Sequence, residues 1–237
     1  MTTTSAEFSA VQAFPLTRRM AAEALGTGFL LTAVVGSGIL GQRLAQGNTA
    51  IALLANALAT AAALFALIEW LAPISGAHFN PVVTAALAVR GDLPVRAAIG
   101  YVPAQVCGAV LGVAVADSMF GVPIWSWSDH PRHGAGSWLG EFVSTFGLVG
   151  AVWVCTRTRP ATVPGVVAAY VGGAFWFTPT DFANPAVTIA RTLTDTFSGI
   201  RPVDVPGFML SEILGATGAV FFFDWLVPRV SNTEKQP

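Results

Sequence analysis

The chain has 237 residues, of which 54% are hydrophobic and 11% are charged, and its mean hydropathy is +0.64. Soluble domains carry about 25% charged residues, so this composition excludes an ordinary soluble protein and indicates an integral membrane protein. The formal net charge of −1 gives no reason to expect nucleic acid as a partner. The two cysteines, Cys107 and Cys155, do not indicate a disulfide framework.

Six stretches are long and apolar enough to cross a bilayer, which takes about 20 residues of helix each. In chain order they cover residues 20–40, 49–71, 95–116, 138–155, 162–178 and 208–227. The fifth is the shortest and depends on its flanking residues to reach that length. No small-residue cleavage site follows a short apolar run at the start, so we expect the first stretch to be retained. The sequence therefore predicts an all-α membrane protein with six transmembrane helices.

The arginines predict the orientation in the membrane. Six alternating spans place the N-terminal arm (1–19), the second and fourth loops and the C-terminal tail (228–237) on one side. That side carries Arg18, Arg19, Arg90, Arg96, Arg157, Arg159, Arg229 and Lys235, against Arg43, Arg132, Arg191 and Arg201 on the other. Because positively charged loops near helix ends stay in the cytoplasm, we expect both termini to be cytoplasmic.

Three short motifs occur twice in the same order, which indicates an internal repeat. They are Glu23-Ala-Leu-Gly-Thr27 and Glu141-Phe-Val-Ser-Thr145, Asn80-Pro-Val-Val-Thr84 and Asn184-Pro-Ala-Val-Thr188, and Gln105-Val-Cys-Gly-Ala109 and Glu212-Ile-Leu-Gly-Ala216. The first repeat covers residues 20–117 and the second covers 138–227, with an extracellular loop, 118–137, between them. Each repeat contains three spans, so the second must enter the membrane in the opposite direction. An inverted repeat places a solute path at the interface of the two copies.

Each Asn-Pro pair predicts the start of a short helix. Residues 81–90 and 185–194 follow the pairs and are compatible with helix but too short to cross the membrane, so we expect re-entrant half-helices. Asn is a preferred N-cap, and Pro is preferred at the first helical position. Half-helices that enter from opposite faces bring two positive helix ends to the midplane. Together with the amides of Asn80 and Asn184, these ends would repel cations and donate hydrogen bonds to neutral polar solutes.

Ser75-Gly-Ala-His-Phe-Asn-Pro-Val82 and Phe182-Ala-Asn-Pro-Ala186, with a Glu early in spans one and four, resemble the aquaporin or major intrinsic protein family. The resemblance covers nearly the whole chain, from Glu23 to about Trp225. It implies a homotetramer in membrane lipid with one pore per subunit and passive conduction of water or small neutral solutes. The boxes at the centre of each pore would be Asn80, Pro81 and Val82, and Asn184, Pro185 and Ala186.

The predicted selectivity filter departs from the family pattern. The family's second box normally reads Asn-Pro-Ala-Arg, whereas the fourth position here is Val187. Counting back from the boxes by the same alignment places Thr60 and Gly172 in the filter, with either Asp181 or Phe182 from the loop. Small residues at these places, and the loss of the arginine, predict a wider, less polar and less positive constriction.

Such a constriction suits solutes larger than water. The second box resembles that of a bacterial branch with Asn-Pro-Ala-Val, which is associated with arsenic-resistance operons, and this implies the bacterial inner membrane as the location. Glycerol-like polyols and the neutral hydroxides of arsenic and antimony are the expected solutes, with water and larger arsenicals as further candidates.

Arg191 has two interpretations. It lies one helical turn after Val187, so it could move the family's positive charge outward into the vestibule. The favoured interpretation is an arginine at the end of a loop that pairs with Asp195 and is exposed to solvent, where ion pairs contribute little.

Buried acids leave a second transport hypothesis open. The resemblance implies that Glu23 and Glu141 accept hydrogen bonds from the non-helical backbone before each half-helix, a task that a broken helix in a membrane requires. His78 is expected to brace the first box. As a proton relay, Glu23, Glu141 and Glu212 would instead make a proton-coupled secondary transporter. Apart from a proton relay, the expected role of Glu212 is in helix packing or at a helix end. An enzyme is not expected, because the sequence offers no nucleophile and base pair, no metal cluster and no cofactor motif.

Overall fold

The computed structural model describes residues 13–227, and in this range every regular element is helical. Six segments of the described range are long and apolar enough to cross a membrane, and each overlaps one predicted stretch. The long helices are α2 (Leu16–Leu44), α3 (Thr49–Ser75), α5 (Val95–Phe120), α6 (Ala135–Thr158), α7 (Val163–Phe177) and α9 (Val205–Leu226). The predicted all-α fold with six spans is therefore confirmed. The start of the predicted N-terminal arm (1–12) and the predicted C-terminal tail (228–237) lie outside the described residues.

Two short 3-10 turns lengthen the later spans. η1 (Pro160–Thr162) precedes α7 and η3 (Pro202–Asp204) precedes α9. The fifth span reaches 18 residues, Pro160–Phe177, only when η1 is included. The sequence predicted that this span would need its flanking residues to cross the membrane.

Both half-helices are present and begin at the prolines. α4 spans Pro81–Arg90, with the predicted bounds, and Asn80 caps it by accepting from Val82 N at 3.0 Å. α8 spans Pro185–Ala190 and is capped in the same way by Asn184. It is shorter than the predicted 185–194, because the chain tightens into the 3-10 turn η2 (Arg191–Leu193). Threonine side chains compete for backbone groups there: Thr192 Oγ1 donates to the Ile189 carbonyl at 2.7 Å.

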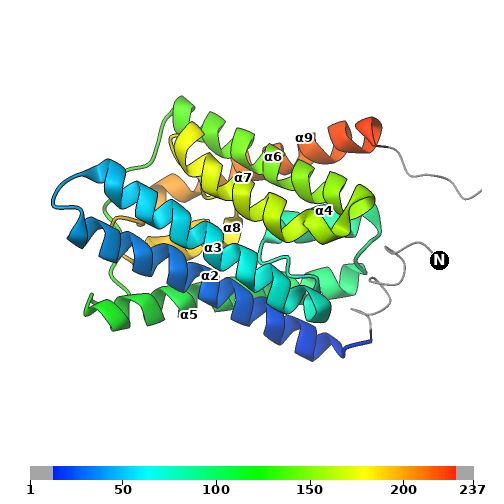
Figure 1. The fold of residues 1–237 in the computed structure, drawn as a ribbon, viewed down its shortest axis with the longest axis horizontal. Coiled ribbons are helices and arrows are strands. Elements are labelled where there is room, and N and C mark those ends of the chain that lie inside the picture. Colours follow the sequence, from blue (N-terminus) through cyan, green and yellow to red (C-terminus); the bar gives the residue numbers. More distant parts are fainter. Residues whose placement is uncertain (1–12, 228–237) are drawn as a thin grey trace, which may run out of the picture.

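The two repeats use the same helix contacts, as an inverted repeat requires. In the first repeat α2 packs against α3 and α5, and in the second α6 packs against α7 and α9. Each half-helix also contacts the last long helix of the other repeat, α4 with α9 and α8 with α5, and α3 packs against α7. Figure 1 shows the long helices along the long axis of the molecule, with α8 among them.

Glycine allows the closest of these contacts. A Cβ atom at Gly108 of α5 would overlap the Ala24 carbonyl oxygen of α2. In the second repeat, a Cβ atom at Gly215 of α9 would lie 2.5 Å from the Phe142 carbonyl oxygen of α6. Small residues at equivalent places therefore let the first and last helix of each repeat approach closely, as is common in membranes.

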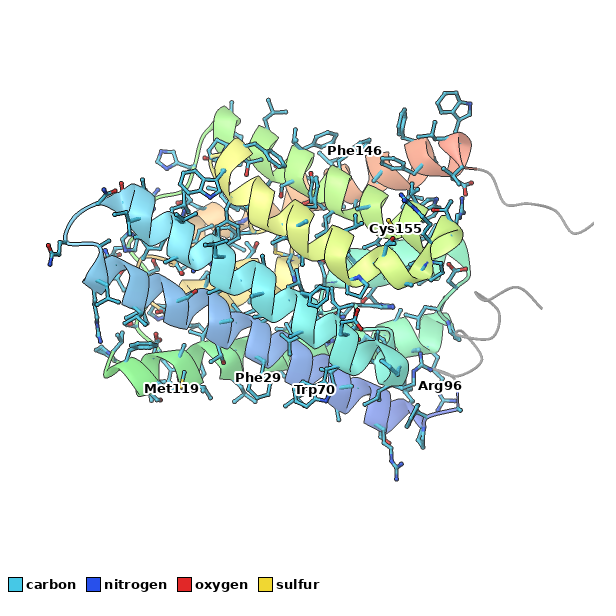
Figure 2. The ribbon with its side chains drawn as sticks, viewed as in Figure 1. Phe29, Trp70, Arg96, Met119, Phe146 and Cys155 are labelled. Carbon is cyan, nitrogen blue, oxygen red and sulfur yellow. The ribbon has the colours of Figure 1, made fainter. Side chains whose placement is uncertain are left out.

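The outer surface carries large apolar side chains. Trp70 is 58% exposed and Met119 is 61% exposed, and the Phe29 and Trp70 ring centroids lie 6.3 Å apart. Figure 2 shows these three side chains along the outer edge of α2, α3 and α5. Exposing such a surface to water is unfavourable, whereas contact with lipid or a neighbouring membrane protein is favourable.

Candidate functional site

The two half-helix starts are bonded to each other through their asparagines. Asn80 Nδ2 donates to the Ala183 carbonyl at 2.7 Å, and Asn184 Nδ2 donates to the Phe79 carbonyl at 2.8 Å. Each asparagine thus caps its own helix with its oxygen and binds the opposite segment with its amide. A side-chain amide has a second N–H group. Because both asparagines line a cavity, they can present that donor to a solute.

Glu23 of α2 holds the non-helical segment before α4. Its carboxylate accepts from Ser75 Oγ at 2.6 Å, His78 N at 3.0 Å, Phe79 N at 2.7 Å and Gln105 Nε2 at 2.8 Å. Phe79 has a φ of 50°, a left-handed conformation that lies outside the right-handed helix, so this segment is not helical. The buried carboxylate therefore takes up backbone donors that would otherwise have no partner in the membrane.

Glu141 of α6 has the equivalent place in the second repeat. It accepts from Phe182 N at 3.1 Å and from Ala183 N at 2.8 Å, and Ala183 is left-handed with a φ of 47°. Like Glu23, Glu141 is fully buried. The structure therefore places both glutamates where the sequence expected backbone acceptors.

Glu212 of α9 is a second acid at this half-helix, which the sequence reading did not assign to it. Its Oε1 accepts from Asn184 N at 3.2 Å and from Thr188 Oγ1 at 2.6 Å. Its repeat equivalent, Gln105, donates to Thr84 Oγ1 at 2.9 Å. The alignment of the Gln105 and Glu212 motifs was the signal that could have found this role.

His78 lies beside the first box. Its Nδ1 is 3.1 Å from Thr84 Oγ1, in the first turns of α4, and its side chain also lines the cavity. His78 therefore contacts the half-helix beside the first box, where a brace was predicted, and it also lines the cavity.

The cavity runs along the interface of the repeats. Its wall on α7 consists of Val163, Val167, Val171 and Phe175, and its wall on α3 includes Thr60, Leu64 and Ile68. The α7 residues recur every fourth position, and twelve residues of helix rise about 18 Å. The cavity therefore follows α7 over most of its length, with aliphatic walls and a few polar groups.

Four of the predicted filter residues line this cavity: Thr60, Asp181, Phe182 and Val187, which together are called the filter region. The two loop candidates, Asp181 and Phe182, therefore both reach the cavity. Asp181 Oδ1 accepts from Ser144 Oγ at 2.8 Å. Asp181 Oδ2 and Thr60 Oγ1 are buried and have no hydrogen-bond partner among the described residues.

Gly172 is not among the residues that line the cavity, and its place in the filter stays a prediction. A Cβ atom at Gly172 would lie 3.0 Å from the Ala61 Cβ of α3, so this position faces the α3 contact. Its neighbour Val171 is on the cavity wall.

Arg191 is neither exposed nor paired with Asp195, which corrects the favoured interpretation. It is 6% exposed, its Nε donates to the Ser198 carbonyl, and it lines the cavity. Its guanidinium carbon lies 3.5 Å from the Phe182 ring centroid. Asp195 instead accepts from Asp129 N at 3.0 Å. Because α8 ends in a 3-10 turn, the side chain at 191 is directed into the molecule instead of along a solvated helix face.

Between residues 13 and 227, no group of three or more His, Cys, Asp or Glu side chains could hold a metal ion. His133 Nδ1 lies 3.0 Å from Arg201 Nη2, and His130 lies near Asp195. These two histidines belong to contacts of the long third loop.

Comparisons with known proteins agree with this geometry. Residues 10–178 match the family described as Major intrinsic protein. The chain is 49% identical over 218 residues to "Aquaglyceroporin AqpS" of Rhizobium meliloti (strain 1021), covering 92% of this chain and 93% of that relative. It is 30% identical over 239 residues to "Probable aquaporin AqpM" of Archaeoglobus fulgidus, covering 89% and 97%. The X-ray structure of the aquaglyceroporin from Plasmodium falciparum matches with a TM-score of 0.73 at 19% identity, covering 90% of this chain and 98% of that one, so the fold is shared. With two capped half-helices meeting in a cavity between inverted repeats, these matches show that the chain belongs to the major intrinsic protein family and is a membrane channel for small neutral solutes, not an enzyme.

Proposed function

We propose that the channel conducts uncharged solutes larger than water, namely glycerol-like polyols and neutral metalloid hydroxides such as arsenite, together with water. The observation that carries this proposal is Val187 on the cavity wall, at the place where the family usually has an arginine. A valine there leaves room in the filter region and adds no donors. Larger arsenicals would also fit a constriction of this kind.

The partners in the filter region suit a hydroxylated solute. Thr60 and Asp181 line the cavity, and their buried Oγ1 and Oδ2 atoms have no partner among the described residues, so each would accept a hydrogen bond from a solute hydroxyl once the side chain turns toward the passage. Val171 and Val187 on the same cavity wall offer carbon surface. A polyol presents both hydroxyls and a carbon backbone, so it can satisfy both sides of the passage.

Relatives support the glycerol assignment by name. The relative that shares 49% identity over most of both chains is called an aquaglyceroporin. We infer the same broad class of solutes for this chain.

Proton-coupled transport is the second candidate, and the contacts of the buried acids argue against it. Glu23 accepts from four donors and Glu141 accepts from two backbone N–H groups. A carboxylate that takes up a proton loses part of this acceptor capacity, so cycling would disrupt the half-helix starts. These acids are therefore better suited to a fixed structural role.

We also propose a homotetramer in the bacterial inner membrane with both termini in the cytoplasm. The exposed apolar side chains on α2, α3 and α5 would then contact lipid or neighbouring subunits. Eight basic residues on one side of the membrane against four on the other support the orientation. The two repeats, 20–117 and 138–227, would each supply half of one pore.

Stopped-flow light scattering on proteoliposomes tests the proposed function. We expect glycerol and arsenite uptake well above that of empty vesicles, driven by the solute gradient alone. Fast water flow without glycerol or arsenite uptake would overturn the wide-filter proposal. Solute flux that follows an imposed pH gradient would favour the coupled transporter.

A further inference from the structure

Arg191 is a buried cation beside the filter region, at a position where the family pattern does not place an arginine. It follows Val187 by one turn, and its side chain is 6% exposed. The Ser198 carbonyl accepts from its Nε, and the Phe182 ring lies against the guanidinium. These two contacts fix the group at the cavity wall.

The terminal nitrogens of Arg191 are open to the cavity. A guanidinium has five N–H donors, and among the described residues only the Nε donor of Arg191 has a partner. Neither Nη1 nor Nη2 is a buried atom without a partner, so both retain accessible surface. Because the residue lines the cavity and is otherwise buried, this surface belongs to the solute path.

A second arginine shows how a purely structural guanidinium differs. Arg132 also lies over Phe182, with its guanidinium carbon 5.4 Å from the ring centroid. Its Nε donates to the Gly199 carbonyl at 2.7 Å and its Nη2 donates to the Phe197 carbonyl at 2.9 Å. Arg132 is not on the cavity wall, and its donors hold a loop.

The charge of Arg191 is not cancelled by contact. Within the described residues, no carboxylate oxygen forms an ion pair with it. The acids whose charges reach it are Glu141 and Asp181, and Arg132 opposes them with a like charge. Arginine keeps its proton in proteins, so a fixed cation lies against Phe182 of the filter region although position 187 is a valine.

We propose that Arg191, anchored on Phe182 and the Ser198 carbonyl, is the charge-selecting residue of this channel and excludes cations from a passage that Val187 leaves wide. This inference rests on the proposed channel function. The family's usual position would put both charge and bulk in the constriction. An arginine one turn later, held against the Phe182 ring at the cavity wall, keeps the positive charge and leaves the constriction wide.

Urea and guanidinium test this separation, since they are planar, similar in size and differ in charge. Purified Arg191→Leu is compared with wild type in proteoliposomes for the flux of each solute. We expect urea flux to persist and the guanidinium flux relative to urea to rise about tenfold or more, a factor that corresponds to about 1.4 kcal/mol of lost repulsion. An unchanged ratio with persisting urea flux overturns the proposal.

Two further substitutions separate charge from shape. Arg191→Lys keeps the charge and should exclude guanidinium as wild type does, whereas Arg191→Gln keeps donors without charge and should pass it as Arg191→Leu does. If Arg191→Leu does not fold, the Gln variant decides the question. The double variant Val187→Arg, Arg191→Val returns the charge to position 187 and should restore exclusion; a double variant that leaks as much as Arg191→Leu contradicts the proposal.

Arg43 is the matched control. It is exposed, its guanidinium carbon lies 5.6 Å from the Phe120 ring centroid, and its Nη2 donates to the Phe120 carbonyl at 2.8 Å. It resembles Arg191 in these contacts but does not line the cavity. Arg43→Leu should leave the guanidinium to urea ratio unchanged, and an equal rise there would show that Arg191 acts only through general destabilisation. Urea flux in wild type tests the channel function itself, so its failure is distinguished from failure of the Arg191 proposal.

Discussion

The side chains of Asn80 and Asn184 each donate to the carbonyl that precedes the other asparagine, with distances of 2.7 and 2.8 Å. Each acceptor residue, Ala183 or Phe79, also donates its own N–H to a buried glutamate of its repeat. The two half-helix starts are therefore one hydrogen-bonded unit, and a shift of one would break a bond to the other.

Asn184→Ala should cost more stability than the loss of an ordinary helix cap. An N-cap contributes about 1 kcal/mol, and the bond to the Phe79 carbonyl adds about 1 kcal/mol. We expect a loss of about 2 kcal/mol in the free energy of unfolding, together with reduced glycerol flux, because a cavity donor is also removed. Thermal unfolding in detergent and vesicle flux measure the two effects.

Asn48→Ala is the matched control for this change. Asn48 caps α3 by accepting from Ala50 N and Ile51 N in an exposed loop, without a cross-repeat bond. It should lose only about 1 kcal/mol and keep its flux. Equal losses in the two variants would mean that the bond between the repeats contributes nothing.

Glu23→Gln and Glu212→Gln should differ sharply. Both oxygens of Glu23 accept two donors each, so a Gln amide would leave donors facing donors, at about 1–3 kcal/mol for each lost partner. Glu212 uses only Oε1, and its Oε2 has no partner among the described residues. The carbonyl oxygen of a Gln amide can accept the same two hydrogen bonds as Oε1, and the equivalent position of the first repeat is a glutamine, Gln105.

The yield of folded protein and the melting temperature measure this contrast. We expect a large loss for Glu23→Gln and little change for Glu212→Gln. A loss in Glu212→Gln as large as in Glu23→Gln would show that the carboxylate charge, and not the number of accepted bonds, is required at both places.

Local rules account for what the sequence could predict. Span length and apolarity gave the six helices, and the capping preferences of Asn and Pro gave the starts of α4 and α8. The acceptor roles of Glu23 and Glu141 were implied by the family resemblance, and they agree with the need to satisfy non-helical backbone in a membrane. Each of these depends on a few neighbouring residues or on one strong solvent constraint.

What escaped prediction depends on helical register and on contacts between distant segments. One residue of register decides whether a side chain on α7 faces the cavity, as Val171 does, or α3, as a Cβ atom at Gly172 would. Arg191 was treated as continuing a regular helix, whereas the turn η2 redirects it toward Phe182. The Ser198 carbonyl that holds it is seven residues further along the chain, and no local motif announces that contact.

Val171→Phe should narrow the channel, whereas Gly172→Ala should not. Val171 lies on the cavity wall, so a phenyl ring there should lower glycerol flux several-fold while water continues to pass. The methyl group that Gly172→Ala adds would instead press against Ala61 of α3 and cost about 1–3 kcal/mol in stability. Flux per folded channel and the melting temperature separate the outcomes. Loss of glycerol flux in Gly172→Ala alone would place position 172 in the filter.

Val187→Arg is the change that tests the filter region most directly. A second guanidinium would enter the cavity one turn from Arg191, where two like charges in a partly buried site repel by a few kcal/mol at most, roughly 2 kcal/mol at 8 Å. Narrowing and repulsion together should lower glycerol and arsenite flux about tenfold or more, a barrier of about 1.4 kcal/mol, while water flow falls much less. Stopped-flow traces for the three solutes in one preparation give these ratios.

Val187→Leu is the control, because it adds volume without charge. If it lowers glycerol flux as much as Val187→Arg, the size of the side chain alone sets the cut-off. If only the arginine lowers the flux, its donors and charge decide. Unchanged permeability for every solute in both variants would mean that position 187 does not line the constriction at all.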